Sequence, residues 1–353
     1  MDKQGTIHNT QTEFGFDHSQ LHTYSGYLKS RKNLLQSASG GAVTAVSEEI
    51  VKRGGVVFGA SYSDDFKRSE YRCVDNLTDL ERLKGSKYCE TSKEIVQNGQ
   101  RMSLYSVLED VLTQNRPVLF VGLGCDVGAV KAYCDTKGLN TENLFLIDLV
   151  CHGPTSAEVH RQYIDRLEKQ HHAKLVSFTV RYKKDGWSPS YIHAEFENGK
   201  IYETPFYESD YGFAFIHYAR PACYCCKYRG ESHKGDITCG DFWGLTNDMN
   251  GWNENGVSIM FVRTKRGEEL IDMIDRDSYH IEEADTAFAL KHNHMYYECR
   301  EKWAHYDKFG NDLKKRGLHY AATHYPMTAK EKVKQVMKRL LPEKLVDKAR
   351  KHR

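Results

Sequence analysis

Four cysteines that could bind a metal lie in three segments far apart in the sequence. Cys223 and Cys226 form a Cys-x-x-Cys pair in RPACYCCKY, whereas Cys125 and Cys151 stand alone in VGLGCDVGAVKAYC and LVCHGPTS. Glycine or proline lies near each of them, so the backbone can fold tightly around a bulky group. A zinc ribbon draws two close pairs from one small module. Thiolates from distant loops are more typical of an iron–sulfur cluster, and we therefore expect redox chemistry.

The close pair leaves two points open. Cys225 lies between its members, so the residues alone do not decide whether Cys225 or Cys226 is the ligand. Unligated loop thiols are a second interpretation, and a buried structural cysteine is the alternative for Cys151. A thioredoxin-type disulfide is disfavoured because no βαβ unit frames the pair. A zinc-stabilised, non-catalytic interaction protein therefore stays an alternative function.

The loop around Cys125 also approaches a dinucleotide-binding pattern. Gly122, Gly124 and Gly128 follow an apolar run, and Asp148 ends the next expected strand. In such fingerprints glycines let a pyrophosphate reach a helix N-terminus, and an acid binds the ribose. Gly128 lies one residue later than the third glycine of the G-x-G-x-x-G fingerprint. A nicotinamide-dependent dehydrogenase using the Gly122 loop is a further alternative.

Two upstream motifs have the composition of anion-binding loops. Ser39-Gly40-Gly41 opens an expected helix with Thr44 on its first turn, and a serine N-cap with two glycines offers amides to a pyrophosphate. The loop 84–88, KGSKY, adds lysines and an aromatic ring. Each motif is also explained as a capped helix or a surface loop.

The segments between these motifs alternate between helical and strand patterns. Expected helices are 39–54, RMSLYSVLEDVLTQ, 127–133 and 156–169, and expected strands are VVFGASY, PVLFVGL and LFLIDLVC. This alternation predicts a partly parallel sheet covered by helices. VSFTVRYKKDGW and SYIHAEFENGKIYETPF predict an antiparallel β insertion. The fold class expected is α/β: a mixed, partly parallel sheet flanked by helices, with an antiparallel β insertion and a C-terminal basic helix.

The motifs, taken in order over about residues 25–285, resemble the coenzyme F420 hydrogenase/dehydrogenase beta-subunit family. RPACYCCKY with GDITCGDFWG is similar to its C-terminal domain, and VGLGCDVGAVKAYC, LVCHGPTS, SASGGAVTAV and KGSKYCETS are similar to its other elements. Members are flavin-containing iron–sulfur proteins that pass electrons between clusters and a flavin, in some cases to a deazaflavin. The resemblance implies a [4Fe–4S] cluster held by Cys125, Cys151, Cys223 and Cys226. It implies FAD bound by Ser39, Gly40, Gly41, Thr44, Lys84, Ser86, Lys87 and Tyr88.

The chain also departs from the family pattern. The Cys125 loop usually reads GTPCQ, and here Leu123, Gly124 and Asp126 replace three of its residues. Ala38 stands where relatives often have a first serine. Relatives often begin with a ferredoxin-like segment, but no cysteine precedes Cys73. We therefore expect at most one cluster, a separate ferredoxin-like electron-donor protein, and a deazaflavin or another small molecule as acceptor.

The expected organisation has four parts: a flexible arm (1–24), an N-terminal flavin-binding part (25–115), a C-terminal iron–sulfur part (116–290) and a helical basic tail (291–353). The other cysteines are expected to be structural, with Cys239 placed to compete as a ligand. We find no apolar signal segment near the N-terminus and no run near the ~18 apolar residues of a membrane span. Ten cysteines are too few for a disulfide scaffold, which predicts reduced thiols and a cytoplasmic protein.

The charge is concentrated at the C-terminus. Residues 330–353 hold ten Lys/Arg and three Asp/Glu, in a chain whose net charge is +2. The remainder is therefore close to neutral or acidic, which argues against nucleic acid as a partner. An apolar stripe recurs at helical spacing through Val333, Val336, Met337, Leu340 and Leu341. This segment is expected either to lie on an anionic membrane surface or to dock on the protein's own core.

Overall fold

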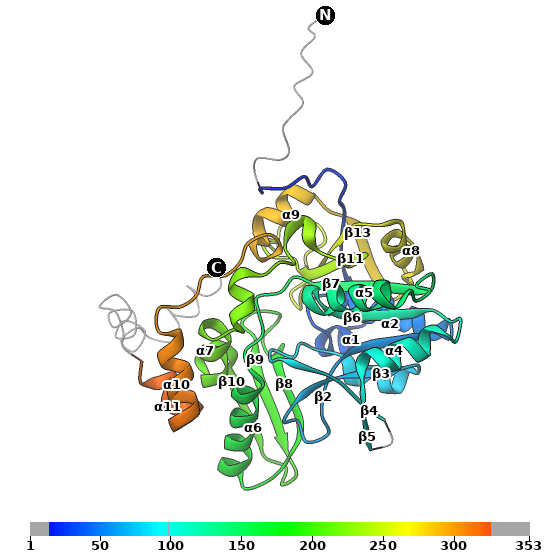
Figure 1. Cartoon of the computed structure of the whole chain (residues 1–353). Coiled ribbons are helices and arrows are strands. Elements are labelled where there is room, and N and C mark those ends of the chain that lie inside the picture. Colours follow the sequence, from blue (N-terminus) through cyan, green and yellow to red (C-terminus); the bar gives the residue numbers. More distant parts are fainter. Residues whose placement is uncertain (1–13, 98, 326–353) are drawn as a thin grey trace, which may run out of the picture.

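The computed structural model describes residues 14–97 and 99–325, and a mixed sheet of ten strands forms the centre of this part (Figure 1). The strand order is β13-β1-β12-β11-β7-β6-β2-β3-β4-β5. The strands are β1 (His22–Leu28), β2 (Val56–Tyr62), β3 (Ser69–Val74), β4 (Thr91–Gln97), β5 (Gln100–Ser103), β6 (Val118–Leu123), β7 (Leu144–Leu149), β11 (Ile237–Asp241), β12 (Ser258–Val262) and β13 (Tyr279–Glu283).

Four neighbouring strands in the middle of this sheet, β2, β6, β7 and β11, run parallel. Strands β6 and β7 pair from Val118↔Leu144 to Leu123↔Leu149. Both are almost continuously apolar because a parallel sheet is covered by helices on both faces. The predicted partly parallel sheet is confirmed.

Helices cover both faces of the parallel strands. Leu119 and Val121 of β6 lie in one core with α2 and α8, whereas Val118 and Phe120 lie in a second core with α4 and α5. Since side chains alternate along a strand, one apolar run supplies both cores. The α-helices are α1 (Arg31–Gln36), α2 (Ala42–Lys52), α3 (Leu77–Leu80), α4 (Leu104–Leu112), α5 (Gly124–Lys137), α6 (Ala157–His171), α7 (Asp210–His217), α8 (Lys265–Met273), α9 (Thr286–His292), α10 (Tyr306–Arg316) and α11 (Leu318–Thr323).

The antiparallel insertion is also confirmed. Strands β8 (Leu175–Tyr182), β9 (Tyr191–Phe196) and β10 (Ile201–Pro205) form a separate sheet of three strands. Its apolar face packs in one core with α6, α7, α10 and α11. Figure 1 shows these helices gathered beside β8–β10, away from α2, α4 and α5.

Several boundaries differ from the expected ones. Strand β5 takes Gln100–Ser103, so the next helix begins at Leu104, and α5 is longer than 127–133 at both ends. Phe14 and Phe16, within the expected arm, are buried beside α9, and β1 pairs with β12 and β13. The expected basic helix at 330–353 lies outside the described residues. None of the helices that are described has the length and apolar character needed to cross a membrane.

Candidate functional site

Two of the predicted cysteine ligands lie at one edge of the parallel sheet. Cys125 occupies the first turn of α5, directly after β6, and Cys151 follows the end of β7. The two strands end side by side at the Leu123↔Leu149 pair. The carboxyl edge of parallel strands is where open α/β sheets place their ligands, so the predicted location of both residues agrees with the structure.

The Cys-x-x-Cys turn packs against Gly153, two residues after Cys151. Cys223 lies in a short 3-10 helix, η3 (Pro221–Cys225), and Cys226 follows it. Gly153 has φ +103°, and a Cβ atom there would lie 3.1 Å from the Cβ and 3.3 Å from the Sγ of Cys223. The amide of Gly153 also donates to the Sγ of Cys151 at 3.2 Å. This position therefore requires glycine, both for its backbone conformation and for the approach of the two cysteines.

Tyr228 fixes the same turn against helix α5. A Cβ atom at Gly128 would lie 2.2 Å from Cε1 of Tyr228, and one at Gly124 would lie 3.0 Å from the Tyr228 Cβ. The two glycines thus leave room for Tyr228, two residues after Cys226. Their absence of side chains is what allows the turn to pack beside Cys125.

These contacts explain the glycines that suggested a dinucleotide site. The side chain of Asp148 is fully buried and accepts hydrogen bonds from the amides of Lys234 and Gly235, with His233 Nδ1 at 3.0 Å. Burial would raise the pKa of Asp148, but the His233 interaction and its other hydrogen bonds leave this pKa lowered. Gly124 and Gly128 leave room for the Tyr228 side chain, and the Asp148 carboxylate accepts hydrogen bonds from groups inside the protein. The structure therefore argues against the nicotinamide alternative.

The four predicted cysteines interact with one another and with arginines. Burial raises the pKa of Cys151 to about 12, and the charges of Cys223 and Cys125 contribute to that rise. Burial likewise raises the pKa of Cys125 and of Cys223, and Cys226 adds to the latter. Neutral thiols are thus favoured until a cation displaces their protons. Within 14–97 and 99–325, no three His, Cys, Asp or Glu side chains are arranged to hold a single metal ion.

The donor set nevertheless fits a cluster better than one ion. Four sulfurs on one zinc, each about 2.3 Å from the metal, crowd around a single point. A four-iron cluster is a larger body, and its thiolates can stand further apart on separate loops. Gly153 N–H···Sγ bonding and nearby guanidinium groups also suit an anionic sulfur-rich group.

The remaining cysteines differ in exposure. Cys89, Cys134 and Cys239 are buried, and Cys239 lies within β11 opposite Leu149 of β7. Cys225 and Cys299 are exposed, and the Cys299 thiol approaches the carbonyl oxygen of Cys226 at 3.6 Å. Buried Cys223 contrasts with exposed Cys225 and half-buried Cys226 in the same turn.

The SASGG segment is packed into the protein's own interior. The amide of Gly40 donates to Ser258 Oγ, and a Cβ at Gly40 would lie 2.1 Å from the carbonyl oxygen of Gly26. Ser39 donates to the carbonyl of Val257. Gly41, not Ser39, is the N-cap of α2. The absent side chain at Gly40 is explained by backbone packing, so these residues do not fit a pyrophosphate cradle.

Thr44 and the lysines of the KGSKY loop are also engaged with protein groups. Thr44 Oγ1 lies 3.0 Å from Ser37 Oγ, and Lys84 Nζ pairs with Glu81 at 2.5 Å. Lys87 Nζ donates to the carbonyls of residues 83, 84 and 85 at 2.9, 2.7 and 3.1 Å. Burial lowers the pKa of Lys87 to about 7. Lys87 therefore holds the loop together, and Ser86 contributes a hydrogen bond to Tyr88.

Strand β8 belongs to the predicted β insertion, but its Arg181 and the following Lys183 were not predicted as site residues, and they link the two predicted flavin motifs. The buried ammonium of Lys183, the residue after this strand, donates to the carbonyl oxygens of Leu34 and Ser39 at 2.7 and 2.6 Å. Two residues earlier, Arg181 Nη1 binds both carboxylate oxygens of Asp241, at 3.0 and 2.9 Å. Arg181 and Asp241 both act electrostatically on Tyr88.

Tyr88 and Tyr207 act electrostatically on Arg181, and Trp243 lies two residues after Asp241. Trp187 and Trp243 lie with ring centroids 4.3 Å apart, and the Trp187 Nε1 is a buried donor for which the described residues offer no hydrogen-bond partner. Tyr207 is 56% exposed and Trp243 is 41% exposed. We call this set the aromatic face: Tyr88, Arg181, Trp187, Tyr207, Asp241 and Trp243.

A stacked row of rings leads from the aromatic face to the cysteines. Tyr88 stacks on Phe215 at 4.3 Å, and Phe215 stacks on His152 at 4.8 Å between centroids. Burial, followed by the charges of Arg300 and Arg229, lowers the pKa of His152 to about 3, so the ring is neutral. His152 directly follows Cys151, and the two predicted sites are therefore joined through three packed rings.

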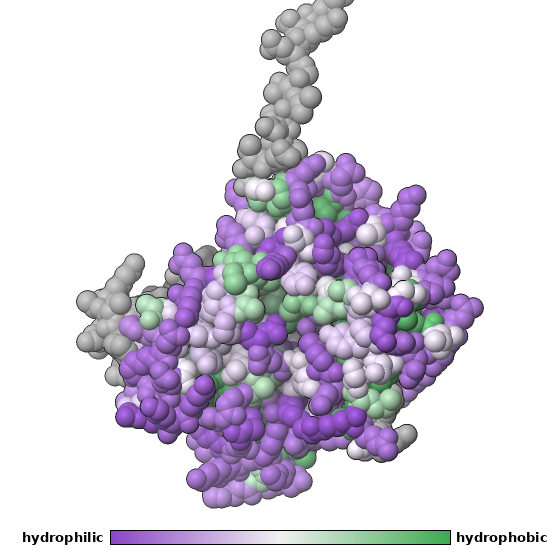
Figure 2. Space-filling view, in the orientation of Figure 1, coloured by the Kyte–Doolittle hydropathy of each residue, from purple (hydrophilic) through white to green (hydrophobic). Residues whose placement is uncertain are grey.

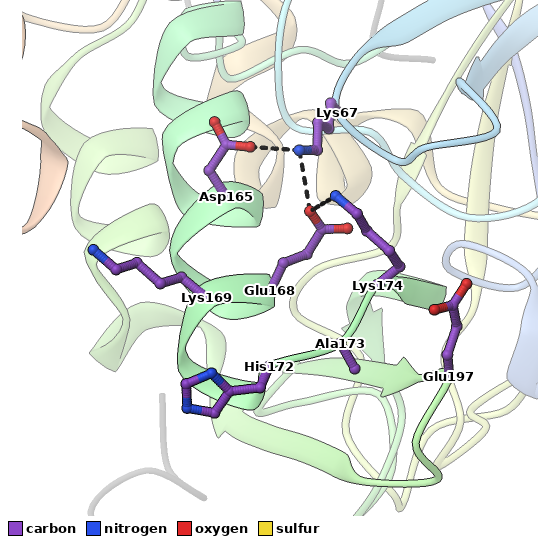
Figure 3. Close-up of a pocket in the computed structure, with 8 residues that line it drawn as sticks. All are labelled: Lys67, Asp165, Glu168, Lys169, His172, Ala173, Lys174 and Glu197. Atoms are coloured by element: carbon purple, nitrogen blue, oxygen red, sulfur yellow. Dashed lines mark hydrogen bonds and ion pairs between the residues drawn. The ribbon is translucent and has the colours of Figure 1, made fainter.

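One face of the molecule carries a patch that is less polar than its surroundings (Figure 2). Figure 2 shows pale and green residues around a hollow between the positions of α7 and α5 in Figure 1. A separate cavity of about 570 Å³ lies by α6, lined by Lys67, Asp165, Glu168, Lys174 and their neighbours (Figure 3). Its side chains form ion pairs with one another, such as Lys67–Asp165 at 2.6 Å. None of the predicted ligands lines this cavity.

Comparison with known proteins supports the resemblance of the motifs. Residues 115–287 match the family described as the C terminus of the coenzyme F420 hydrogenase/dehydrogenase beta subunit. Among solved structures, a chain of the xenon-derivatised F420-reducing [NiFe] hydrogenase complex from Methanosarcina barkeri is similar, with 16% identity and a TM-score of 0.49. That alignment covers 77% of this chain and 89% of the other. No curated protein matches the sequence.

Proposed function

From the premise that residues 115–287 belong to the family defined by the C terminus of the coenzyme F420 hydrogenase/dehydrogenase beta subunit, we propose that this protein is an iron–sulfur flavoprotein oxidoreductase. It would pass electrons between a [4Fe–4S] cluster, FAD and an external acceptor. The observation that carries the proposal is the convergence of Cys125, Cys151 and the Cys223 turn at the carboxyl edge of the parallel sheet.

Cys125, Cys151, Cys223 and Cys226 would hold the cluster as thiolates. The Gly153 amide, which already donates to the Sγ of Cys151, would orient that ligand. Tyr228, packed on the glycines of α5, keeps the Cys223–Cys226 turn beside Cys125. The cluster would supply one-electron chemistry, while the protein sets its distance from other groups, its potential and its access to solvent.

The flavin proposal rests on the family and on the aromatic face. Ser39, Gly40, Gly41 and Thr44 are used in internal packing, so we assign them a supporting role for the loop that Lys183 holds. Lys84, Ser86 and Lys87 shape the loop that presents Tyr88. The exposed rings of Tyr207 and Trp243 offer stacking surfaces for a planar aromatic ligand such as the isoalloxazine ring. The row Tyr88–Phe215–His152 runs from Tyr88 of the aromatic face to the residue after Cys151.

The partners follow from this assignment. A separate ferredoxin-like protein would donate electrons, and the family name makes a deazaflavin of the F420 type a candidate acceptor. Contact of residues 330–353 with a membrane surface stays a prediction, because that segment lies outside the described part.

Anaerobic mixing with a one-electron donor tests the proposed function. We expect protein purified without oxygen, supplied with FAD and mixed with reduced viologen, to show bleaching of the cluster followed by reduction of the flavin. Cys151→Ser should bind flavin but reduce it more slowly, because the path through the cluster is lost. Equal flavin reduction rates in the two proteins, or no flavin binding by either, would contradict the proposal.

A further inference from the structure

Three arginines lie near the cysteine site: Arg220 and Arg229 flank the Cys223–Cys226 turn, and Arg300 comes from a segment after α9. Arg220 Nη2 donates to the Sγ of Cys125 at 3.4 Å and also interacts with Cys223. Arg300 Nη1 donates to the carbonyl of Phe215 at 3.1 Å and lies 3.2 Å from His152 Nδ1. Arg229 donates to the carbonyl of Met295. Arg220 thus contacts a ligand sulfur directly, and Arg300 lies against His152, the residue that follows Cys151.

Electrostatic interactions indicate that the guanidinium groups act on the thiols. The charge of Arg229 opposes the rise of the pKa of Cys151 that burial causes. Arg220 and Arg229 oppose the corresponding rise for Cys223. Burial lowers the pKa of Arg300, whereas Cys223 and Cys151 raise it. Each arginine thus interacts with at least one of the proposed ligands.

Each of the three arginines also has an unsatisfied donor. Its Nε atom is buried and has no hydrogen-bond partner among the residues described. Buried donors of this kind are costly, and more so on a charged group. Arg72, Arg116 and Arg166 also have an unpartnered Nε, so the direct contact of Arg220 with sulfur, and not the unpartnered atoms by themselves, marks this site for an anionic group.

Few carboxylates offset this charge. Glu90 Oε1 forms an ion pair with Arg220 Nε at 3.7 Å and offsets part of the charge of that arginine. Asp126 Oδ1 lies 3.9 Å from the Sγ of Cys125 and raises the pKa of that thiol, and the same carboxylate is paired with Lys93 at 2.7 Å. Two carboxylates thus stand against Arg220, Arg229, Arg300 and Lys93. The balance around the sulfurs is therefore positive.

We infer that Arg220, Arg229 and Arg300 form a cationic shell that stabilises the reduced, more negative state of the centre at Cys125, Cys151, Cys223 and Cys226, and so raises its reduction potential. This inference rests on the proposed function. Reduction adds one electron from the donor to the cluster, and reoxidation passes it to the acceptor. Net charge and hydrogen bonds to sulfur are established determinants of cluster potential. The arginines neither gain nor lose a proton in this step.

Charge-removing variants of the full chain, prepared anaerobically, test the shell. Arg220→Gln and Arg300→Gln are each expected to shift the one-electron reduction equilibrium about tenfold toward the oxidised form, equivalent to a potential lower by about 59 mV. Arg220→Lys and Arg300→Lys should recover part of the shift, because they restore the charge but not the guanidinium geometry. The measurements are iron content and an EPR-monitored redox titration.

Arg53→Gln is the matched control. Arg53 is exposed at the C-cap of α2, just before β2 begins, and so lies at the opposite edge of the sheet from the cysteines. The reduction potential of the centre in Arg53→Gln should equal that of the wild type. Unchanged potentials in both glutamine variants would overturn the inference.

Loss of iron is informative as well. A glutamine variant that loses iron while its lysine counterpart retains it supports the shell, because charge is then required. Loss of iron from both the glutamine and the lysine variant, at Arg220 and at Arg300, would show that these arginines have a structural role and would overturn the inference. A wild-type protein that binds no iron refutes the proposed function and the shell with it, whereas bound iron with unshifted potentials refutes the shell alone.

Discussion

Replacing Cys223 by serine is expected to remove the bound iron and to lower the free energy of unfolding by about 3 kcal/mol or more. Cys223 is buried against Gly153 and interacts with Cys151 and Cys226. Because the ligands come from three segments, the metal centre ties those segments together, and its binding free energy adds to folding. Iron analysis and anaerobic urea unfolding measure the two effects.

Cys225→Ser is the matched control within the same turn. Cys225 is exposed, so its replacement should change neither iron content nor stability. Cys73→Ser, in strand β3, should also retain full iron. If Cys225→Ser loses iron and Cys226→Ser keeps it, the ligand assignment in this turn is wrong.

Gly128→Val is expected to reduce iron content strongly and to destabilise the fold by about 1–3 kcal/mol through overpacking. The new Cβ would lie 2.2 Å from the Tyr228 ring. Tyr228 would then move away from α5, and the turn with Cys223 and Cys226 would move away from Cys125. Iron per chain and the urea midpoint report the change.

Ala132→Val controls for the helical cost of a β-branched residue, since Ala132 is exposed one turn further along α5. The double variant Gly128→Val/Tyr228→Ala should recover part of the iron lost in Gly128→Val, because it removes the clash. Coupling of this kind is expected only between residues in contact. Gly128→Val with the same iron content and stability as Ala132→Val would show that Tyr228 does not position the turn.

The central part of the fold could be predicted because its signals are local. VLFVGL and LFLIDL are apolar runs of strand length, each followed by a glycine-containing segment with one cysteine. Parallel pairing then brings Cys125 and Cys151 to one edge. Strand β1 was missed because its pattern in HTYSGYL is weak and its partners, β12 and β13, lie more than 200 residues later.

Tertiary contacts explain what the sequence could not reveal about the site. Nothing local to SASGG shows that Gly40 faces the carbonyl of Gly26 and the Ser258 side chain. The motif therefore predicts a ligand loop, although backbone packing accounts for its glycine. Arg220 and Arg229 flank the cysteine turn in the sequence and are a local signal, whereas Arg300 reaches Tyr224 of that turn from a segment after α9.

The most direct test of the central claim is the composition of protein purified without oxygen, measured as iron, acid-labile sulfide and zinc per chain together with EPR after reduction. We predict about four iron and four sulfide per chain, no stoichiometric zinc, and an EPR signal that appears on reduction. About one zinc per chain, without sulfide and without an EPR signal, would contradict the cluster and would favour the zinc-stabilised interaction protein.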